Sequence, residues 1–147
     1  MPVISDGQHS VHVAIGESNG VVGAQCPGLP MTILDGRLTR NGSFKHELAQ
    51  GRNAWIHAID GAIDVAVSVN ATRLQKGQAI ATGNSERDEP LVVHVSNSND
   101  AQAHFVILDG EAIDESFIQQ GPFVMSSTEE IEAINQAFVD GRFGSID

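Results

Sequence analysis

The feature that most constrains the fold is a succession of short β-type segments separated by Gly, Asn and Asp. Apolar residues in these segments alternate with polar ones or form short runs, as in strands that bury one face. The expected strands are residues 11–15, 31–39, 43–48, 53–59, 63–69, 78–81, 91–95 and 102–108. The pattern predicts an all-β chain, with an antiparallel double-sheet sandwich of jelly-roll type.

One stretch near the C-terminus departs from this pattern. In residues 128–140, Ile131 and Phe138 belong to an apolar stripe at helical spacing. Ser127 and Glu130 have the spacing of a capping box at the start of this stretch. We therefore predict a short C-terminal α-helix, whose apolar stripe packs on the barrel or on a neighbouring subunit.

Length and charge narrow the class of protein. The chain has 147 residues, which suits a single domain over residues 1–147. Its net charge of −11, from 19 acidic and 8 basic side chains, argues against direct binding to nucleic acid or to anionic membranes. The sequence shows no secretory signal and no apolar run long enough to span a bilayer, so we expect a cytoplasmic protein.

Three motifs between His104 and Gly144, "HFVILDGE", "IQQGPFVM" and "GRFG", occur in fixed order around the expected helix. Together with "VHVAIGE", "MTILDGRL" and "NAWIHAIDG" nearer the N-terminus, they resemble the C-terminal domain of the pirins, a family of two-domain proteins in the cupin superfamily. The resemblance implies a cupin jelly-roll β-barrel. Two departures are Ser126, where the family usually has Asn, and residues 112–116, where it usually has a proline-containing stretch.

The resemblance also raises the question of a metal, because cupin enzymes carry two histidines, a glutamate and a later histidine on adjoining strands. Aligning that pattern on the glycines of this chain puts the glutamate at Ala54 and the first histidines within residues 47–50. The later histidine falls near Asp88. Since none of these positions carries the expected ligand, and pirins hold their metal in an N-terminal domain that this sequence lacks, we expect no metal and no other cofactor.

An atypical site would have to use other residues. The candidates for a ligand or metal site are His46, Glu47, His57, His94 and His104. His46 and Glu47 are adjacent on an expected strand, so they point to opposite faces. His57 shares a strand face with Trp55, and His104 alternates with apolar residues, as packed histidines do. Cys26 lies in a loop with no base near it in the sequence, which argues against a reactive thiol.

These observations lead to two functional hypotheses. The first is a stand-alone pirin-like cupin domain that serves as a non-catalytic binding or regulatory module, with a protein partner or a small aromatic ligand. The alternative is a cupin dioxygenase resembling quercetin 2,3-dioxygenase, which would use iron or another divalent metal in an atypical histidine site. We also expect a homodimer, with Trp55, Phe117 and Phe123 as candidate contact residues.

Overall fold

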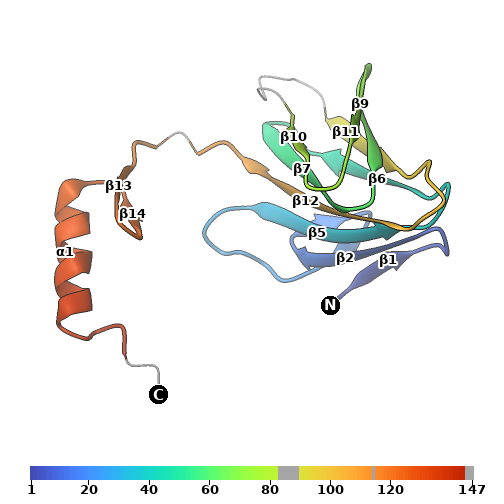
Figure 1. Ribbon diagram of the computed structural model, residues 1–147. Helices are drawn as coiled ribbons and strands as arrows, with labels where there is room; N and C mark the ends of the chain where they lie inside the picture. Colours follow the sequence, from blue (N-terminus) through green and yellow to red (C-terminus); the bar gives the residue numbers. More distant parts are fainter. Residues whose placement is uncertain (83–89, 114, 145–147) are drawn as a thin grey trace. The chain divides into compact units, whose positions relative to one another are not determined.

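The computed structural model describes residues 1–82, 90–113 and 115–144 (Figure 1). The chain divides into two compact units, Met1–Ala112 and Ile113–Asp147, which are called the N-terminal and C-terminal units below. The single domain over residues 1–147 stays a prediction. No helix in the described parts of the chain is long and apolar enough to cross a membrane.

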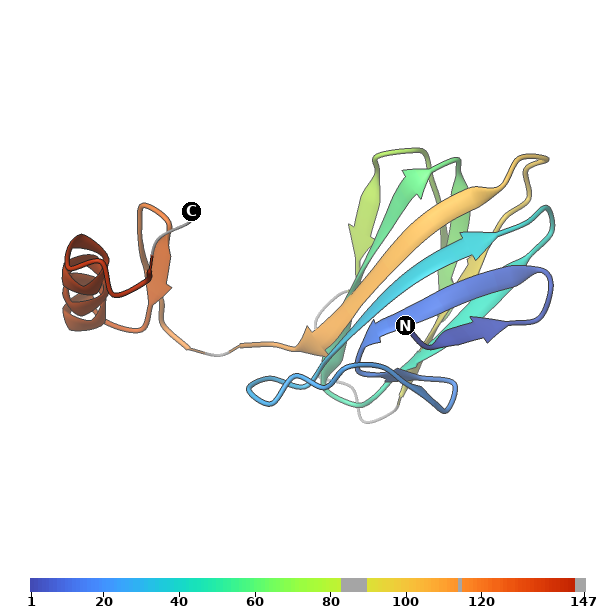
Figure 2. The same ribbon diagram turned by 90° about the horizontal axis from the view of Figure 1, so that it is seen from below.

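Two antiparallel sheets lie face to face in the N-terminal unit (Figures 1 and 2). The larger sheet has the order β1-β2-β5-β12-β7-β10, with strands β1 (Val3–Ser5), β2 (His9–Ile15), β5 (Met31–Leu38), β12 (Ala103–Glu111), β7 (Arg52–Asp60) and β10 (Ala79–Ala81). The smaller sheet has the order β6-β11-β8-β9, with strands β6 (Ser43–Leu48), β11 (Leu91–Ser96), β8 (Ile63–Val67) and β9 (Asn70–Leu74). A separate hairpin joins β3 (Glu17–Ser18) to β4 (Val21–Val22). The predicted all-β sandwich is confirmed.

Every strand expected from the sequence has a counterpart in the structure. The sequence did not predict several strand ends, or several further strands. The strand expected over residues 63–69 ends at Val67, because Ser68 has a φ of 54° and turns the chain into β9. This edge strand was not predicted, since Asn70–Leu74 shows neither the alternation nor the apolar content of a half-buried strand. The strands β1, β3 and β4 were missed because each has only two or three residues, too few to show an alternation.

Alternate residues of the longer strands form the core between the sheets. In β12 the inward residues include Phe105 and Ile107, which are fully buried together with Leu34 of β5 and Val93 of β11. Gly36 lies opposite Phe105 in the register of β5 and β12. A Cβ atom at Gly36 would be 2.3 Å from the Phe105 ring, so the ring occupies the space that a side chain would need.

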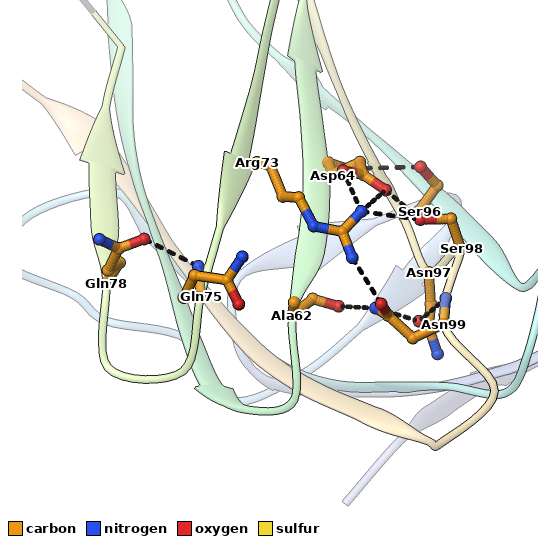
Figure 3. A network of polar contacts seen from close by, with 9 residues as sticks. All are labelled: Ala62, Asp64, Arg73, Gln75, Gln78, Ser96, Asn97, Ser98 and Asn99. Carbon is orange, nitrogen blue, oxygen red and sulfur yellow. Dashed lines mark hydrogen bonds and ion pairs between the residues drawn. The ribbon is translucent and has the colours of Figure 1, made fainter.

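A polar network holds the outer edge of the smaller sheet (Figure 3). Arg73 of β9 donates from Nη1 to Asp64 Oδ1 of β8 at 3.1 Å and to Ser98 Oγ at 3.0 Å. Ser98 Oγ donates in turn to Asp64 Oδ2 at 2.6 Å. Asn99 Nδ2 donates to the carbonyl of Ala62 at 2.8 Å. The edge strand is thereby tied both to its neighbour and to the loop after β11.

The C-terminal unit consists of a hairpin, β13 (Ile118–Gln120) with β14 (Phe123–Met125), and the helix α1 (Thr128–Val139). The predicted helix is confirmed, and Ser127 Oγ accepts a hydrogen bond from Glu130 N at 3.2 Å. The reciprocal bond of the capping box reaches one residue further back than predicted, from Ser126 N to Glu130 Oε2 at 2.9 Å. The Phe123 ring centroid is 6.3 Å from that of Phe138, so the hairpin and the helix share aromatic contacts.

Candidate functional site

A polar pocket with a volume of about 460 Å³ opens in the N-terminal unit; we call it the His46 pocket. Its walls come from the β3–β4 hairpin and its turn, from β5, β6, β7 and β12, and from the chain between β6 and β7. All but one of the lining residues have polar side chains. They are Glu17, Ser18, Asn19, Thr32, His46, Glu47, Ala49, Arg52 and Asp109.

The centre of this site is a buried pair formed by His46 and Asp109. His46 alternates with Leu48 on the buried face of β6, and Asp109 continues the inward series of Phe105 on β12. The two strands belong to different sheets, so the pair bridges the sandwich. His46 Nε2 lies 2.6 Å from Asp109 Oδ2. Because an ionised carboxylate only accepts hydrogen bonds, His46 donates from Nε2 in this contact.

Ser18 meets the other ring nitrogen of His46. The β3–β4 hairpin turns through Asn19 and Gly20, whose φ values of 47° and 77° match the positive φ that a type I′ turn requires at both central residues. This tight turn holds Ser18 Oγ 2.9 Å from His46 Nδ1. In the neutral imidazole that carries its proton on Nε2, Nδ1 is an acceptor, and the Ser18 hydroxyl donates to it.

Arg52 compensates the buried charge of Asp109. Its Nη2 is 2.6 Å from Asp109 Oδ1, and the Asp109 side chain is only 2 % exposed. The same nitrogen donates to the carbonyl of Pro30 at 3.3 Å and to Thr32 Oγ1 at 3.4 Å. A buried carboxylate needs such partners because an uncompensated charge away from water is very costly.

The donors of this pocket do not fit the metal that the cupin fold implies. Both ring nitrogens of His46 and both carboxylate oxygens of Asp109 already have protein partners. The Arg52 guanidinium beside Asp109 would also repel a cation. Over residues 1–82, 90–113 and 115–144, no group of three or more His, Cys, Asp or Glu side chains is placed to hold a metal ion.

The candidate residues from the sequence are distributed over several surfaces. His46 and Glu47 both border the pocket. His46 lies on the buried face of β6, and Glu47 lies on the exposed face of that strand. His57 lies on the outer face of β7, with its ring 4.9 Å from that of Trp55. His94 is on the outer face of β11, and His104 on the outer face of β12 is hydrogen-bonded to Asp35. Asp88, near which the cupin pattern puts its later histidine, lies outside the described residues.

The residues that we expect to contact a second copy of the chain in a homodimer lie in both units. Trp55 is 41 % exposed and Phe117 is 69 % exposed. Phe123 is partly buried and packs with Phe138 and Phe143 in the C-terminal unit. Phe117 borders an apolar hollow of about 600 Å³ in the same unit.

Sequence reasoning missed three central residues of the pocket, Ser18, Arg52 and Asp109. Asp109 did leave a signal, because a carboxylate at an inward position of a strand that otherwise buries Phe105 and Ile107 needs a partner inside the protein. Ser18 left none, since a serine between Glu17 and an Asn-Gly turn has the composition of an ordinary loop.

A smaller hollow of about 220 Å³ shares Glu17, Thr32 and Arg52 with the His46 pocket and is also lined by Cys26. Hydrogen bonds to the backbone of Leu29 and Gly28 lower the pKa of the Cys26 thiol. The sequence, which shows no base near Cys26, did not indicate this shift, because the shift comes from the backbone of the loop itself.

Comparisons with known proteins agree with this architecture. The chain is 28% identical to human pirin (Homo sapiens) over 133 residues, which cover 90% of this chain and 43% of that protein. It is 31% identical over 114 residues to a Pseudomonas aeruginosa protein provisionally named a quercetin 2,3-dioxygenase, covering 78% of this chain and 36% of that protein. The chain thus spans less than half the length of these two relatives.

A solved structure and a family model also match this chain. A crystal structure of quercetin 2,3-dioxygenase from Acinetobacter baumannii superposes with a TM-score of 0.77 at 24% identity, covering 100% of this chain and 48% of that one, which shows the shared fold. The family model for the pirin C-terminal cupin domain matches residues 33–144. The chain therefore belongs to the pirin C-terminal cupin domain family.

Proposed function

We propose that this pirin-like cupin domain is a binding module that takes a small molecule in the His46 pocket without a resident metal. The observation that carries the proposal is the closed set of contacts among Ser18, His46, Asp109 and Arg52. Both ring nitrogens of His46 and Asp109 Oδ2 are hydrogen-bonded within this set, and the Arg52 ion pair compensates Asp109 Oδ1, which accepts no hydrogen bond from the described residues. These contacts give the pocket a polar floor whose side chains already contact one another, in place of open metal coordination positions.

The pocket has the size and chemistry for such a ligand. Its volume of about 460 Å³ falls within the roughly 300–1,000 Å³ of small-molecule sites. Hydroxyl and amide groups of Ser18, Asn19 and Thr32 line it, and the carboxylates of Glu17 and Glu47 border it. A ligand rich in hydroxyl groups, such as a flavonol, could donate hydrogen bonds to these carboxylates.

A metal-dependent dioxygenase remains the second candidate function, favoured by the similarity to the Pseudomonas aeruginosa protein. Such an enzyme needs imidazole and carboxylate ligands that converge on one metal. His57, His94 and His104 lie on outer sheet faces, away from the buried face that carries His46. The binding module is the function that these placements support better.

Metal content and flavonol binding separate the two candidates. Untagged protein would be produced with iron, manganese, nickel, copper and zinc available, and its bound metal measured by elemental mass spectrometry. We expect almost no metal, and we expect the metal-free protein to bind quercetin in calorimetric titration. Near-stoichiometric metal together with oxygen-dependent quercetin turnover would establish the dioxygenase instead.

A pair of variants tests whether the quercetin lies in the His46 pocket. Glu47→Gln removes a carboxylate acceptor at the exposed border, and we expect about tenfold weaker quercetin binding. The matched control, Glu129→Gln, changes an exposed glutamate of α1 and should leave the affinity unchanged. Equal affinities in both variants would place the ligand elsewhere and contradict the proposal.

A further inference from the structure

The contacts in the His46 pocket form one directed chain of hydrogen bonds. His46 Nε2 is 2.6 Å from Asp109 Oδ2, and His46 Nδ1 is 2.9 Å from Ser18 Oγ. In the neutral imidazole that carries its proton on Nε2, Asp109 accepts from His46 and His46 accepts from the Ser18 hydroxyl. All three side chains are buried, and all three line the pocket. A hydroxyl bonded to an imidazole, which is oriented in turn by a carboxylate, is the arrangement that activates a serine nucleophile.

The surroundings of Ser18 hold its hydroxyl in position. The Asn19–Gly20 turn fixes the end of the hairpin, so the Ser18 hydroxyl is held beside the imidazole. Asn19 Nδ2 donates to Ser18 Oγ at 3.3 Å and to the carbonyl of Lys45 at 2.9 Å. These two bonds hold Ser18 Oγ beside the strand that carries His46.

We infer that Ser18 is a nucleophile activated by His46, and that the pocket captures small carboxylic esters covalently. Ser18 Oγ forms a bond to the ester carbonyl carbon, and its proton moves to His46 Nδ1. The bond from this carbon to the alcohol oxygen then breaks, and the leaving alcohol takes the proton from His46. The products are acyl-Ser18 and the free alcohol. Asp109 is a positioning residue, because it orients His46 and contacts no reacting atom.

This inference rests on the proposed function of the pocket as a binding site, and it names carboxylic esters as the ligand class. The test uses the full chain with p-nitrophenyl acetate. We expect a burst of about one equivalent of p-nitrophenol per chain, as acyl-enzyme formation produces. Peptide mass spectrometry should then find an acetyl group on Ser18. A fluorophosphonate probe should label the same residue.

Variants identify the residues responsible. Ser18→Ala should abolish the burst and the label, while Ser116→Ala, which removes an exposed hydroxyl from the C-terminal unit, should retain both. Asp109→Asn should slow the burst at least tenfold. The burst rate of Asp109→Asn should also change with pH differently from that of the unaltered protein, which loss of packing alone would not produce. Circular dichroism would verify that each variant is folded.

Two results would overturn the inference. The first is a folded, unaltered protein with neither burst nor label, and the second is acetylation that persists in Ser18→Ala. In either case the quercetin titration still reports on the proposed function, because reversible binding in the pocket needs no nucleophile. Loss of quercetin binding with an intact Ser18 burst would instead reject the flavonol and retain the ester-capturing pocket.

Discussion

At the scale of single residues, the most consequential contact is the buried ion pair of Arg52 and Asp109. Their side chains are 18 % and 2 % exposed, and the closest nitrogen and oxygen are 2.6 Å apart. Arg40 and Asp100 form another ion pair at 3.0 Å, but those side chains are 67 % and 85 % exposed. Water already solvates the surface pair, so only the buried pair depends on its partner for charge compensation.

Replacing Arg52 by methionine should therefore destabilise the N-terminal unit. Arg52→Met keeps an unbranched side chain but leaves the Asp109 carboxylate without its cation, and we expect a loss of about 3 kcal/mol in the free energy of unfolding. Arg40→Met, the matched control, should change it by less than about 0.5 kcal/mol. Urea denaturation measures both, and similar values for the two variants would contradict this account of the buried pair.

At the scale of elements, the close packing of β5 on β12 depends on the absence of a side chain at Gly36. Phe105 of β12 fills that space, and its ring is fully buried in the core. Gly28, in the loop before β5, has no heavy atom within 4 Å of the position a Cβ would take. The two glycines thus differ in the space around them.

Gly36→Ala should displace the Phe105 ring and cost about 1–3 kcal/mol in the free energy of unfolding, as overpacking of a core does. Gly28→Ala should be close to neutral, because its added methyl group meets no neighbour. Thermal unfolding followed by circular dichroism would compare the two variants. A neutral Gly36→Ala would mean that the strands separate easily enough to accept the methyl group.

At the scale of the whole molecule, an apolar row crosses the outer face of the larger sheet. Ile33 of β5 pairs with Leu108 of β12, which pairs with Trp55 of β7. Ile33 and Leu108 are partly exposed, and Trp55 is 41 % exposed. We propose that a second copy of the chain covers this row in a homodimer, because adjacent apolar side chains on three paired strands favour removal from water.

Trp55→Ala should convert the dimer into a folded monomer, since it removes the largest side chain of the row without opening the core between the sheets. Val69→Ala is the control, because Val69 is 94 % exposed and lies outside the row. Light scattering at several protein concentrations reports the mass of each variant. A dimer that persists in Trp55→Ala, or an unaltered protein that is already monomeric, would reject this interface.

The amino-acid sequence by itself determined the longer strands, the terminal helix and the family, because alternation, capping and motif order are local properties of the chain. It also identified His46 and Glu47 as candidates. Only the tertiary structure brought Ser18 to His46, 28 residues away along the chain, and His46 to Asp109, 63 residues away. Both contacts depend on how the two sheets pack and where the β3–β4 hairpin turns. Such long-range contacts leave no periodicity in the sequence, so the pocket became visible only in the folded chain.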